Sequence, residues 1–480
     1  MTLTIWDEQG IASHNFNPVY SFENPADKNI QSMTSGISDE KGNYYYVSYP
    51  PFSFIFAYTI LKVFHAPLNL YSFYGLNLIL HFITALLLYL IIHSILGTKP
   101  FEQKIDAGTL GFTLYLFLSM TAWFHGHVYF ADSLIQPLWL AGTLLVIHIF
   151  WREKIDDRRF LIGFGVIAFL AVYTEWLGVF FTFTTFLLAF KRSFKDRRFI
   201  KLTILTAVVT LACLALTVTQ FALISGLETF IQASIEKYSS RSAISTDRYY
   251  FMLDLIILLR TFFFENIPVL AIAVILALGN LIIRKKADTT DKFKNKLALG
   301  FLLCFPPLLH HASFAEFTRI HDFALIKTLT CLIIFTALMY HLLESKLEDK
   351  TVDTYRAFII GITVILLILS GYIYHVRNQH VASSIFQETA DIILDTSSKD
   401  DAIFFIGERQ VNETIVFFDQ QDSYAVAPHI LLAARRNMIA APDTSTIIQH
   451  LKKHNVKSAM VYTINRQTEI TEINKIELPN

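Results

Sequence analysis

The sequence predicts an all-α membrane domain that crosses the bilayer about ten times, followed by a small C-terminal α/β domain. Of the 480 residues, 53% are hydrophobic and only 17% are charged, whereas soluble domains carry about 25% charged residues. The chain also contains 43 Phe and 21 Tyr, which are typical of lipid-facing surfaces and interfacial belts. Its net charge is zero, so the composition gives no indication of nucleic-acid binding.

Apolar stretches near the length of a spanning helix, about 20 residues, recur along the chain. The expected spans are 71–96, 107–124, 134–151, 160–173, 177–190, 200–224, 266–283, 297–309, 323–343 and 357–375. Two shorter apolar helices, 52–64 and 251–264, are flanked by Pro or charge and are expected to lie at the interface. An eleventh span is expected if the full gene begins upstream of Met1.

Lys and Arg are concentrated in every second connection, which predicts the orientation. The loops 152–159, 191–201 and 284–296 are rich in Lys and Arg, whereas 125–133 has neither and 309–321 has only Arg319. The basic loops are therefore expected in the cytoplasm. Residues 1–70 then form an extracytoplasmic loop with an interfacial helix, 71–376 the spanning domain, and 377–480 an extracytoplasmic soluble domain.

The C-terminal stretch reads as α/β because its apolar residues follow strand and helix periods in turn. The run DAIFFIG at 401–407 predicts a buried strand, 445–453 a helix, and 458–462 a second strand.

Polar residues at the predicted external helix ends are the candidate site, because ionisable groups near lipid cost about 2.5–3.5 kcal/mol each on insertion scales. They fall into four groups: Asp7 with Glu8, Asp132, Glu175, and the stretch 310–322, which holds His310, His311, Glu316, Arg319, His321 and Asp322. Solvated loops, and N-caps for Asp132 and Glu175, are the simpler interpretation. Together, these side chains could deprotonate an acceptor and bind a phosphate leaving group.

The order of these features resembles the lipid-dependent membrane glycosyltransferases of the GT-C superfamily. That superfamily includes the protein O-mannosyltransferases of glycosyltransferase family 39 and the bacterial aminoarabinose transferases. The Asp7-Glu8 pair stands where the family opens its first external loop. Tyr49-Pro50-Pro51-Phe52 precedes the interfacial helix, and Asp132 precedes an apolar helix, in the family's order.

This resemblance implies a transferase in the bacterial inner membrane that moves a sugar from a polyprenyl-phosphate donor to a glycan, lipid or protein acceptor. By the resemblance, Asp7 is the general base, and Glu8 and Asp132 support the acceptor or the base. Arg319 and His321, with Glu175 and His311, belong to the donor phosphate site. A divalent metal is a possible cofactor, but the spacing of the His and Asp residues assigns no metal ligand.

Three other functions fit an integral membrane protein of this kind. A transporter would predict paired half-chains with broken helices. A polysaccharide polymerase or ligase would carry its large external loop between late helices, whereas here the large soluble part is terminal. A receptor or scaffold would leave the charges at 310–322 without a purpose.

Overall fold

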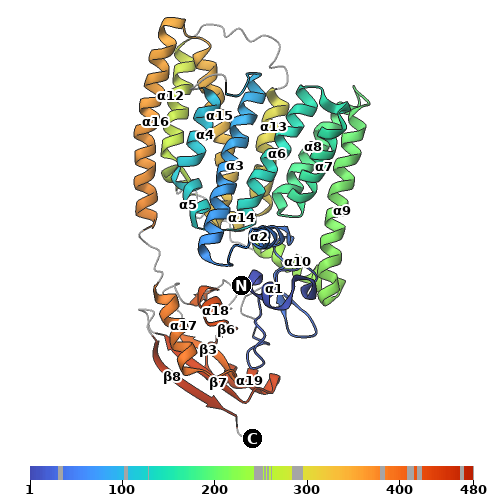
Figure 1. The fold of residues 1–480 in the computed structure, drawn as a ribbon, viewed down its shortest axis with the longest axis vertical. Coiled ribbons are helices and arrows are strands. Elements are labelled where there is room, and N and C mark those ends of the chain that lie inside the picture. The colour runs from blue at the N-terminus through green and yellow to red at the C-terminus, as the bar shows by residue number, and fades with distance from the viewer. Residues whose placement is uncertain are drawn as a thin grey trace. The chain divides into compact units, whose positions relative to one another are not determined.

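The chain forms two units, one helical and one built around a sheet (Figure 1). The computed structural model describes residues 1–30, 36–101, 106–127, 129–242, 252, 256, 259–260, 262–283, 296–378, 384–407, 416–418, 424–426, 428–464 and 470–478. The helical unit contains Tyr49–Thr217 and Tyr238–His380. The sheet unit contains Met1–Ser48, Val218–Lys237 and Val381–Asn480.

The helical unit is made of helices, of which the long ones run in alternating directions (Figure 1). They are α2 Phe52–Val63, α3 Leu70–Leu96, α4 Ala107–Phe117, α5 Ser119–His127, α6 Ala131–Trp151, α7 Arg158–Val172, α8 Trp176–Ser193, α9 Phe199–Ser225, α12 Ile267–Ile282, α13 Lys296–Ser313, α14 Ala315–Ile320, α15 Ile326–Glu344 and α16 Asp349–Asn378. Because their directions alternate, the starts of α6, α8 and α15 lie at the same end of the bundle as the end of α13.

Five helices of the described chain are long and apolar enough to cross a membrane: Leu70–Leu96, Ala131–Trp151, Phe199–Ser225, Phe323–Glu344 and Thr351–Val376. The α4 and α5 helices meet at a bend of 54° and pass the same test as a pair, which raises the count to six. The helices Ile267–Ile282 and Ala298–Ser313 are apolar but shorter. The predicted all-α membrane domain is therefore confirmed, whereas the expected count of about ten spans is not.

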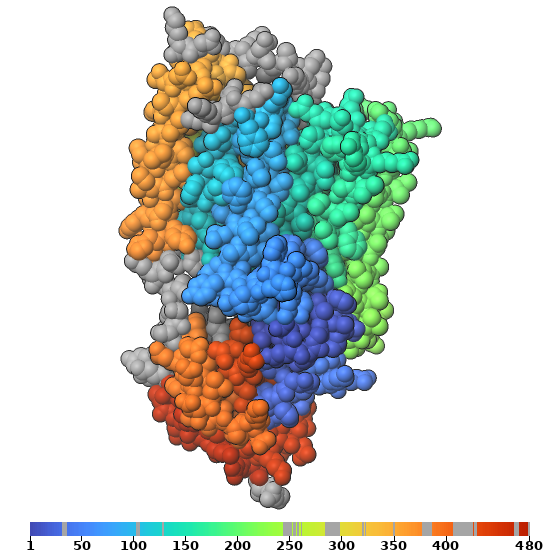
Figure 2. Space-filling view, in the orientation of Figure 1, coloured from blue at the N-terminus to red at the C-terminus, as the bar shows by residue number. Residues whose placement is uncertain are grey.

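Two candidate spans at the edges of the helical unit expose most of their apolar side chains. In their most apolar windows only 22% of α9 and 17% of Thr351–Val376 is buried, against 67% of α6. Leu211 on α9 and Ile368 on α16 are 67% and 69% exposed. Figure 2 shows α16 in orange and α9 in light green as the flanks of this unit. Because apolar patches of this extent are unfavourable in water, we infer that both flanks face lipid.

The helix expected at 52–64 is present as α2, and its place at the interface stays a prediction. In Figure 1 it lies across the end of the bundle rather than along the long helices. A hydrogen bond of 3.1 Å from Phe52 N to Tyr173 O ties its first residue to the turn between α7 and α8. Its far end exposes Val63 and Phe64, as expected at a bilayer interface. The other expected interfacial helix, 251–264, falls largely outside the described residues.

The sheet unit is organised by a six-stranded sheet in the order β4-β5-β6-β3-β7-β8. Its central strand β3 pairs in parallel with β6 and β7, and the other pairs are antiparallel. The bounds are β3 Asp401–Gly407, β4 Val416–Phe418, β5 Tyr424–Val426, β6 Met438–Ala440, β7 Ser458–Ile464 and β8 Ile470–Glu477, with helices α17 Ser384–Thr396, α18 Pro428–Ala434 and α19 Thr444–His454. The strands predicted at 401–407 and 458–462 and the helix at 445–453 are confirmed.

Alternate side chains of β3 enter two cores on the two faces of the sheet. Ile403 and Phe405 pack in a core with residues of α17 and α18. Ala402 and Phe404 pack in the other core with residues of α19. The unbroken apolar run of β3 is therefore explained by burial on both faces.

The N-terminal segment, with α1 (Thr2–Gln9) and the short strands β1 (Ile37–Ser38) and β2 (Tyr44–Tyr45), also belongs to the sheet unit. Arg436 Nε donates to Asp27 Oδ2 at 2.5 Å, and Asn437 Nδ2 donates to Asp27 Oδ1 at 3.0 Å. Phe22 N donates to Asn437 Oδ1 at 2.8 Å. This buried network joins the first 30 residues to the start of β6, a connection that the sequence did not predict.

We expect the stability of the sheet unit to depend on the protonation of His450. Burial, with smaller contributions from His454 and Lys453, lowers the pKa of His450 from 6.5 to about 4. Because the folded pKa lies below the unfolded one, His450 supports the fold above pH 6.5, and that support is lost as the pH falls toward 4. Amide exchange in β3 and β7, corrected for intrinsic rates, should therefore accelerate over this range.

The matched variant is His450→Phe, which keeps an aromatic ring against Phe404, whose centroid lies 5.3 Å from the imidazole. This variant should remove the acceleration. An identical pH dependence in the wild type and the variant would contradict the assignment.

Candidate functional site

A buried lysine contacts two acidic side chains inside the helical unit. Lys327 lies in the first turn of α15, with Nζ at 2.8 Å from Asp132 Oδ1 and 3.0 Å from Glu175 Oε1. The side chains of Lys327 and Glu175 have no exposed surface, and that of Asp132 is 7% exposed. A single charge in such an environment is costly. The three side chains are therefore tolerated because they compensate one another.

His310, in the last turn of α13, completes this group. Its Nε2 lies 2.7 Å from Glu175 Oε1 and 3.0 Å from Lys327 Nζ. A nitrogen and a carboxylate oxygen at 2.7 Å need a proton between them, so we assign the proton to Nε2, which donates to Glu175. The approach of Lys327 Nζ to Nε2 is then a close contact without a hydrogen bond, because an ammonium group only donates. His310 Nδ1 is buried and has no hydrogen-bond partner in the described part of the chain, which favours the neutral ring. Asp132, Glu175, His310 and Lys327 are called the charge cluster below.

Helix starts place both acids of the charge cluster. Asp132 is in the first turn of α6. Glu175 is the N-cap of α8, and its Oε2 accepts a hydrogen bond of 2.9 Å from Leu177 N. Helix N-termini favour negative side chains, so both acids occupy sites that suit them. Lys327, by contrast, sits at a helix N-terminus that disfavours a cation, and we attribute its position to the two carboxylates.

The turn that carries Glu175 requires a glycine. A Cβ at Gly178 would lie 2.2 Å from the carbonyl oxygen of Ala171, so α8 packs against the end of α7 at a distance that excludes any larger residue. This close approach fixes Glu175 at the junction of the two helices.

Two prolines shape α13 before it reaches His310. Pro306 and Pro307 lie inside the helix and have no backbone N–H to donate. The carbonyl of Leu303, which would accept from residue 307, instead accepts a hydrogen bond from Cys331 Sγ at 3.2 Å. Cys331 lies one turn after Lys327 on α15, so this bond holds together the two helices that carry His310 and Lys327.

The two carboxylates of the charge cluster are not equivalent. Glu175 uses both oxygens, one toward Lys327 and His310 and the other toward a backbone N–H. Asp132 faces Lys327 through Oδ1, and its buried Oδ2 has no hydrogen-bond partner among the described residues. A carboxylate oxygen of this kind is able to accept a hydrogen bond or a proton from a substrate hydroxyl.

The ring of Phe317 lies between the side chain of Arg241 and His310 of the charge cluster. The guanidinium carbon of Arg241 is 5.3 Å from the ring centroid of Tyr49 and 4.8 Å from that of Phe317, within cation–π range. The Phe317 ring in turn lies 6.3 Å from His310 and 4.6 Å from His321. A second positive charge is thereby held at the same end of the helical unit as the charge cluster.

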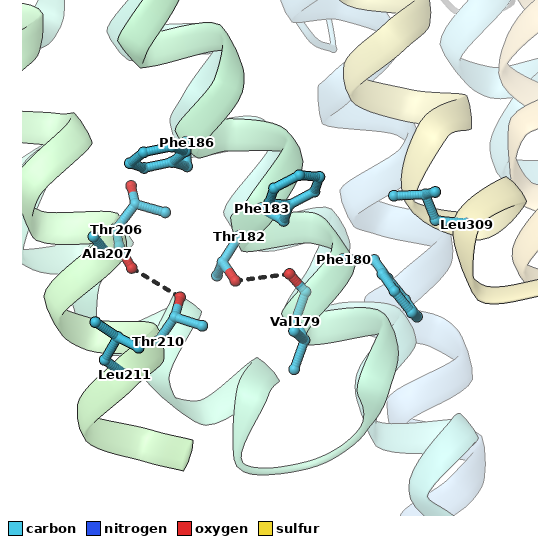
Figure 3. A pocket seen from close by; sticks show the side chains of 10 residues that line it. All are labelled: Val179, Phe180, Thr182, Phe183, Phe186, Thr206, Ala207, Thr210, Leu211 and Leu309. Atoms are coloured by element: carbon cyan, nitrogen blue, oxygen red, sulfur yellow. Dashed lines mark hydrogen bonds between the residues drawn. The ribbon is translucent and has the colours of Figure 1, made fainter. Parts of the chain in front are cut away.

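An apolar groove is lined by side chains of α8, α9 and α13 (Figure 3). Its volume is about 470 Å³, and it is lined by Val179, Phe180, Thr182, Phe183, Phe186, Thr206, Ala207, Thr210, Leu211 and Leu309 from α8, α9 and α13. The three threonine hydroxyls donate to backbone carbonyls of their own helices, which leaves the groove without a free polar donor from these side chains. It therefore suits a hydrocarbon chain.

Consecutive residues of α13 connect the groove to the charge cluster. Leu309 lines the groove, and His310 belongs to the cluster. Phe180, also in the groove wall, meets the imidazole of His310 edge to face at 6.2 Å. The wall of the groove and the charge cluster therefore adjoin through α13 and the contact between Phe180 and His310.

The structure brings together two of the predicted site residues, Asp132 and Glu175. His311 points elsewhere: Nε2 lies 2.8 Å from Thr328 Oγ1 and Nδ1 lies 3.1 Å from Thr318 Oγ1. Because Thr318 donates its own proton to Phe314 O, His311 Nδ1 must be the donor, and Nε2 then accepts from Thr328. Both ring nitrogens are thereby engaged in holding α13, α14 and α15 together.

Arg319 and His321 lie at the end of α14. The His321 ring stacks on Phe323 at 5.1 Å with an interplanar angle of 25°. The side chain of Arg319 lies outside the described part of the structure. Their predicted roles at a phosphate therefore stay predictions.

Asp7 and Glu8 are exposed residues of α1 in the sheet unit. Glu8 Oε1 accepts a hydrogen bond of 2.7 Å from Arg435 Nη1. Trp6, immediately before them, is fully buried and donates from Nε1 to Asn17 O. The position of the acidic pair on this helix is thus fixed by its buried neighbour.

Lys327 and Arg241 were missed by the sequence analysis. Lys327 carried a usable signal, because an ionisable residue inside an apolar run is a functional candidate. It was overlooked within the expected span 323–343. Arg241 follows a polar stretch, and nothing in the local sequence distinguishes it from other surface arginines. His310 was part of the predicted polar stretch 310–322 but had no assigned role.

The charge cluster does not fit a divalent metal. In the described residues, no group of three or more His, Cys, Asp and Glu side chains is arranged to hold an ion. Lys327 Nζ occupies the space between Asp132, Glu175 and His310. We therefore derive no step through a metal ion.

No family model and no curated protein matches the sequence, but solved structures share its fold. The oligosaccharyltransferase of Archaeoglobus fulgidus in the apo form matches with a TM-score of 0.50 and 11% identity over 96% of this chain and 68% of that chain. The same enzyme with Zn and sulfate gives 0.49 and 12% over 87% and 60%. ArnT from Cupriavidus metallidurans bound to undecaprenyl phosphate gives 0.40 and 12% over 96% and 91%.

At these identities the likeness shows the fold alone, which is shared with the A. fulgidus oligosaccharyltransferase. The chain spans 60–68% of the length of the A. fulgidus chains that it matches. The resemblance to the O-mannosyltransferase or aminoarabinose transferase branch stays a prediction.

We expect Lys327→Met to destabilise the purified full chain. Methionine keeps the volume but leaves two buried carboxylates without their cation, which costs about 3–5 kcal/mol when a buried pair loses one partner. The matched control is Lys201→Met, because Lys201 forms a surface pair with Asp156 at 3.4 Å and such pairs contribute about 0–1 kcal/mol. Thermal unfolding in detergent measures the difference. Equal melting temperatures for both variants would show that the cluster is not charged.

Proposed function

We propose that the chain is a glycosyltransferase that moves a sugar from a polyprenyl-phosphate donor to a glycan, lipid or protein acceptor. The observation that carries this proposal is an apolar groove whose wall adjoins a buried charge cluster at α13 and Phe180. An amphiphile with a long hydrocarbon chain and a charged head has matching chemistry. The fold shared with an oligosaccharyltransferase supports the same conclusion.

We propose that the reaction takes place on the extracytoplasmic face of the membrane, which in a bacterium is the inner membrane. The basic loops 152–159 and 191–201 lie at the opposite end of the bundle from the charge cluster, so by the positive-inside rule the cluster end faces outward. We propose that the shorter helices α7, α8, α12 and α13 also cross the bilayer, which gives about ten spans. The C-terminal domain would then be extracytoplasmic.

In the proposed reaction the acceptor hydroxyl attacks the anomeric carbon of the donor. The bond from that carbon to the acceptor oxygen forms while its bond to the phosphate oxygen breaks, which releases polyprenyl phosphate. The hydroxyl proton passes to a carboxylate, for which the sequence resemblance supports Asp7, with Glu8 and Asp132 in support. Arg319 and His321 would stabilise the phosphate that leaves, with Glu175 and His311 holding the elements around it.

A transporter is the second candidate, and one observation favours it. The α4 and α5 helices form a span broken by a bend of 54°, and broken helices are common in transporters. Transfer of the sugar to an acceptor without movement of solute into sealed vesicles would separate the two functions.

The groove predicts binding of the lipid carrier itself, whatever the sugar. Native mass spectrometry of the full chain should show undecaprenyl phosphate bound in preference to undecaprenol, because only the former has a charged head for the cluster end. Ala207→Phe should weaken this binding, since Ala207 lines the groove. Ala215→Phe, on an exposed position of the same helix, is the matched control. Equal binding of both lipids would remove the main support for a phosphate-linked donor.

The general base is tested by Asp7→Asn, which keeps the size of the side chain and removes its basicity. Turnover with a polyprenyl-phosphate sugar should fall by about 10²–10⁴-fold while donor binding is kept. The control is Glu40→Gln, an exposed acid of the same N-terminal segment. Asp27 and Asp39 would be poor controls, because Asp27 pairs with Arg436 and Asp39 accepts from Tyr45 and Asn43. Wild-type turnover in Asp7→Asn would exclude Asp7 as the base.

A further inference from the structure

The ammonium group of Lys327 lies where a bound metal ion would meet the charge cluster. Its Nζ is 2.8 Å from Asp132 Oδ1, 3.0 Å from Glu175 Oε1 and 3.0 Å from His310 Nε2. Two carboxylate oxygens and an imidazole nitrogen around one cation are the kind of ligand set that holds Zn²⁺ or Mn²⁺. In this protein the cation is the ammonium group of Lys327.

The geometry excludes a metal ion together with this lysine. A divalent ion would sit about 2.0–2.2 Å from each ligand atom, and that space is filled by Nζ. The imidazole is also unsuited to be a ligand as it stands, because its Nε2 is 2.7 Å from Glu175 Oε1 and carries the proton of that hydrogen bond. A metal-ligating nitrogen must be free of its proton.

We propose that Lys327 is a built-in cation that replaces a divalent metal in the charge cluster, so that the site binds no metal ion. Lys327 acts as a positioning residue: its charge holds the carboxylates of Asp132 and Glu175 at the ends of α6 and α8. That this cluster serves sugar transfer rests on the proposed function, but the absence of a metal requirement at the cluster does not.

Removal of the lysine side chain should convert the cluster into a metal site. Lys327→Ala frees the central space and leaves two carboxylates and one imidazole with no cation between them. Each ligand atom would need to move inward by roughly 0.8 Å to reach metal-ligand distances. A divalent ion that binds there would restore the lost positive charge and raise the melting temperature, since it binds the folded state.

The test measures Mn²⁺ binding to the purified, metal-free full chain in nanodiscs by loss of the free-ion signal in electron paramagnetic resonance. We expect no binding that depends on Glu175 in the wild type, and one bound ion per chain in Lys327→Ala. The double variant Lys327→Ala/Glu175→Gln should lose that ion. A parallel thermal melt of Lys327→Ala should shift upward with Mn²⁺, while that of the wild type should not.

Two results would overturn the proposal. One is stoichiometric Mn²⁺ binding to the wild type that Glu175→Gln abolishes. The other is a folded Lys327→Ala that binds no Mn²⁺. If Lys327→Ala does not fold without metal, purification in Mn²⁺ decides: a folded protein with one bound ion supports the proposal, and failure to fold with the ion present contradicts it.

Because no arm of this experiment measures transfer, its outcome is separate from that of the proposed function. A chain that binds no undecaprenyl phosphate but gains a Mn²⁺ site in Lys327→Ala would contradict the glycosyltransferase proposal alone.

Discussion

The ion pairs of Lys327 are the constraint on which the helical unit depends. Two carboxylates and an ammonium group lie among apolar helices with almost no exposed surface. Each charge alone would be strongly unfavourable there. The helices α6, α8, α13 and α15 must therefore meet at one point, although their contributing residues are spread from position 132 to position 327.

The four helices can meet at this point because of local irregularities in their sequence and hydrogen bonding. Gly178 allows α8 to approach the end of α7, and Pro306 with Pro307 deprives α13 of backbone hydrogen bonds. The carbonyl left over at Leu303 is satisfied by Cys331 from α15. The irregularities of three helices thus lie at the same junction. There, Leu309 lines the apolar groove and His310 belongs to the charge cluster.

The sequence predicted the helices well, because hydrophobicity dominates where a chain meets lipid. The expected spans 71–96 and 200–224 agree with α3 and α9 to within one residue. The expected span 107–124 proved to be two helices, since the chain breaks between Phe117 and Ser119, and no Pro or Gly marks that break. Residues 1–48 joined the sheet unit through Asp27 and Arg436, 409 positions apart, and no local pattern reports such a pairing.

For the candidate site, the residue types at helix ends were visible in the sequence, but their partners were not. Asp132 and Glu175 were proposed because acids before apolar helices are unusual near lipid, and the structure brings both to Lys327. Lys327 itself was hidden, since one lysine hardly changes the mean hydropathy of a run of 22 residues, Phe323–Glu344. His311, which the sequence could not distinguish from His310, is engaged by two threonines instead.

The two carboxylates differ in how many of their oxygens accept from a donor, and this difference separates their roles. Both oxygens of Glu175 accept from donors, which are an ammonium, an imidazole N–H and a backbone N–H. Such a carboxylate is held too firmly to accept another proton without breaking the cluster. Asp132 has the lysine on one oxygen and no hydrogen-bond partner from the described residues on the other. If a substrate hydroxyl reaches the charge cluster, it therefore donates to Asp132 Oδ2. Glu175 meanwhile keeps the ammonium group of Lys327 in place.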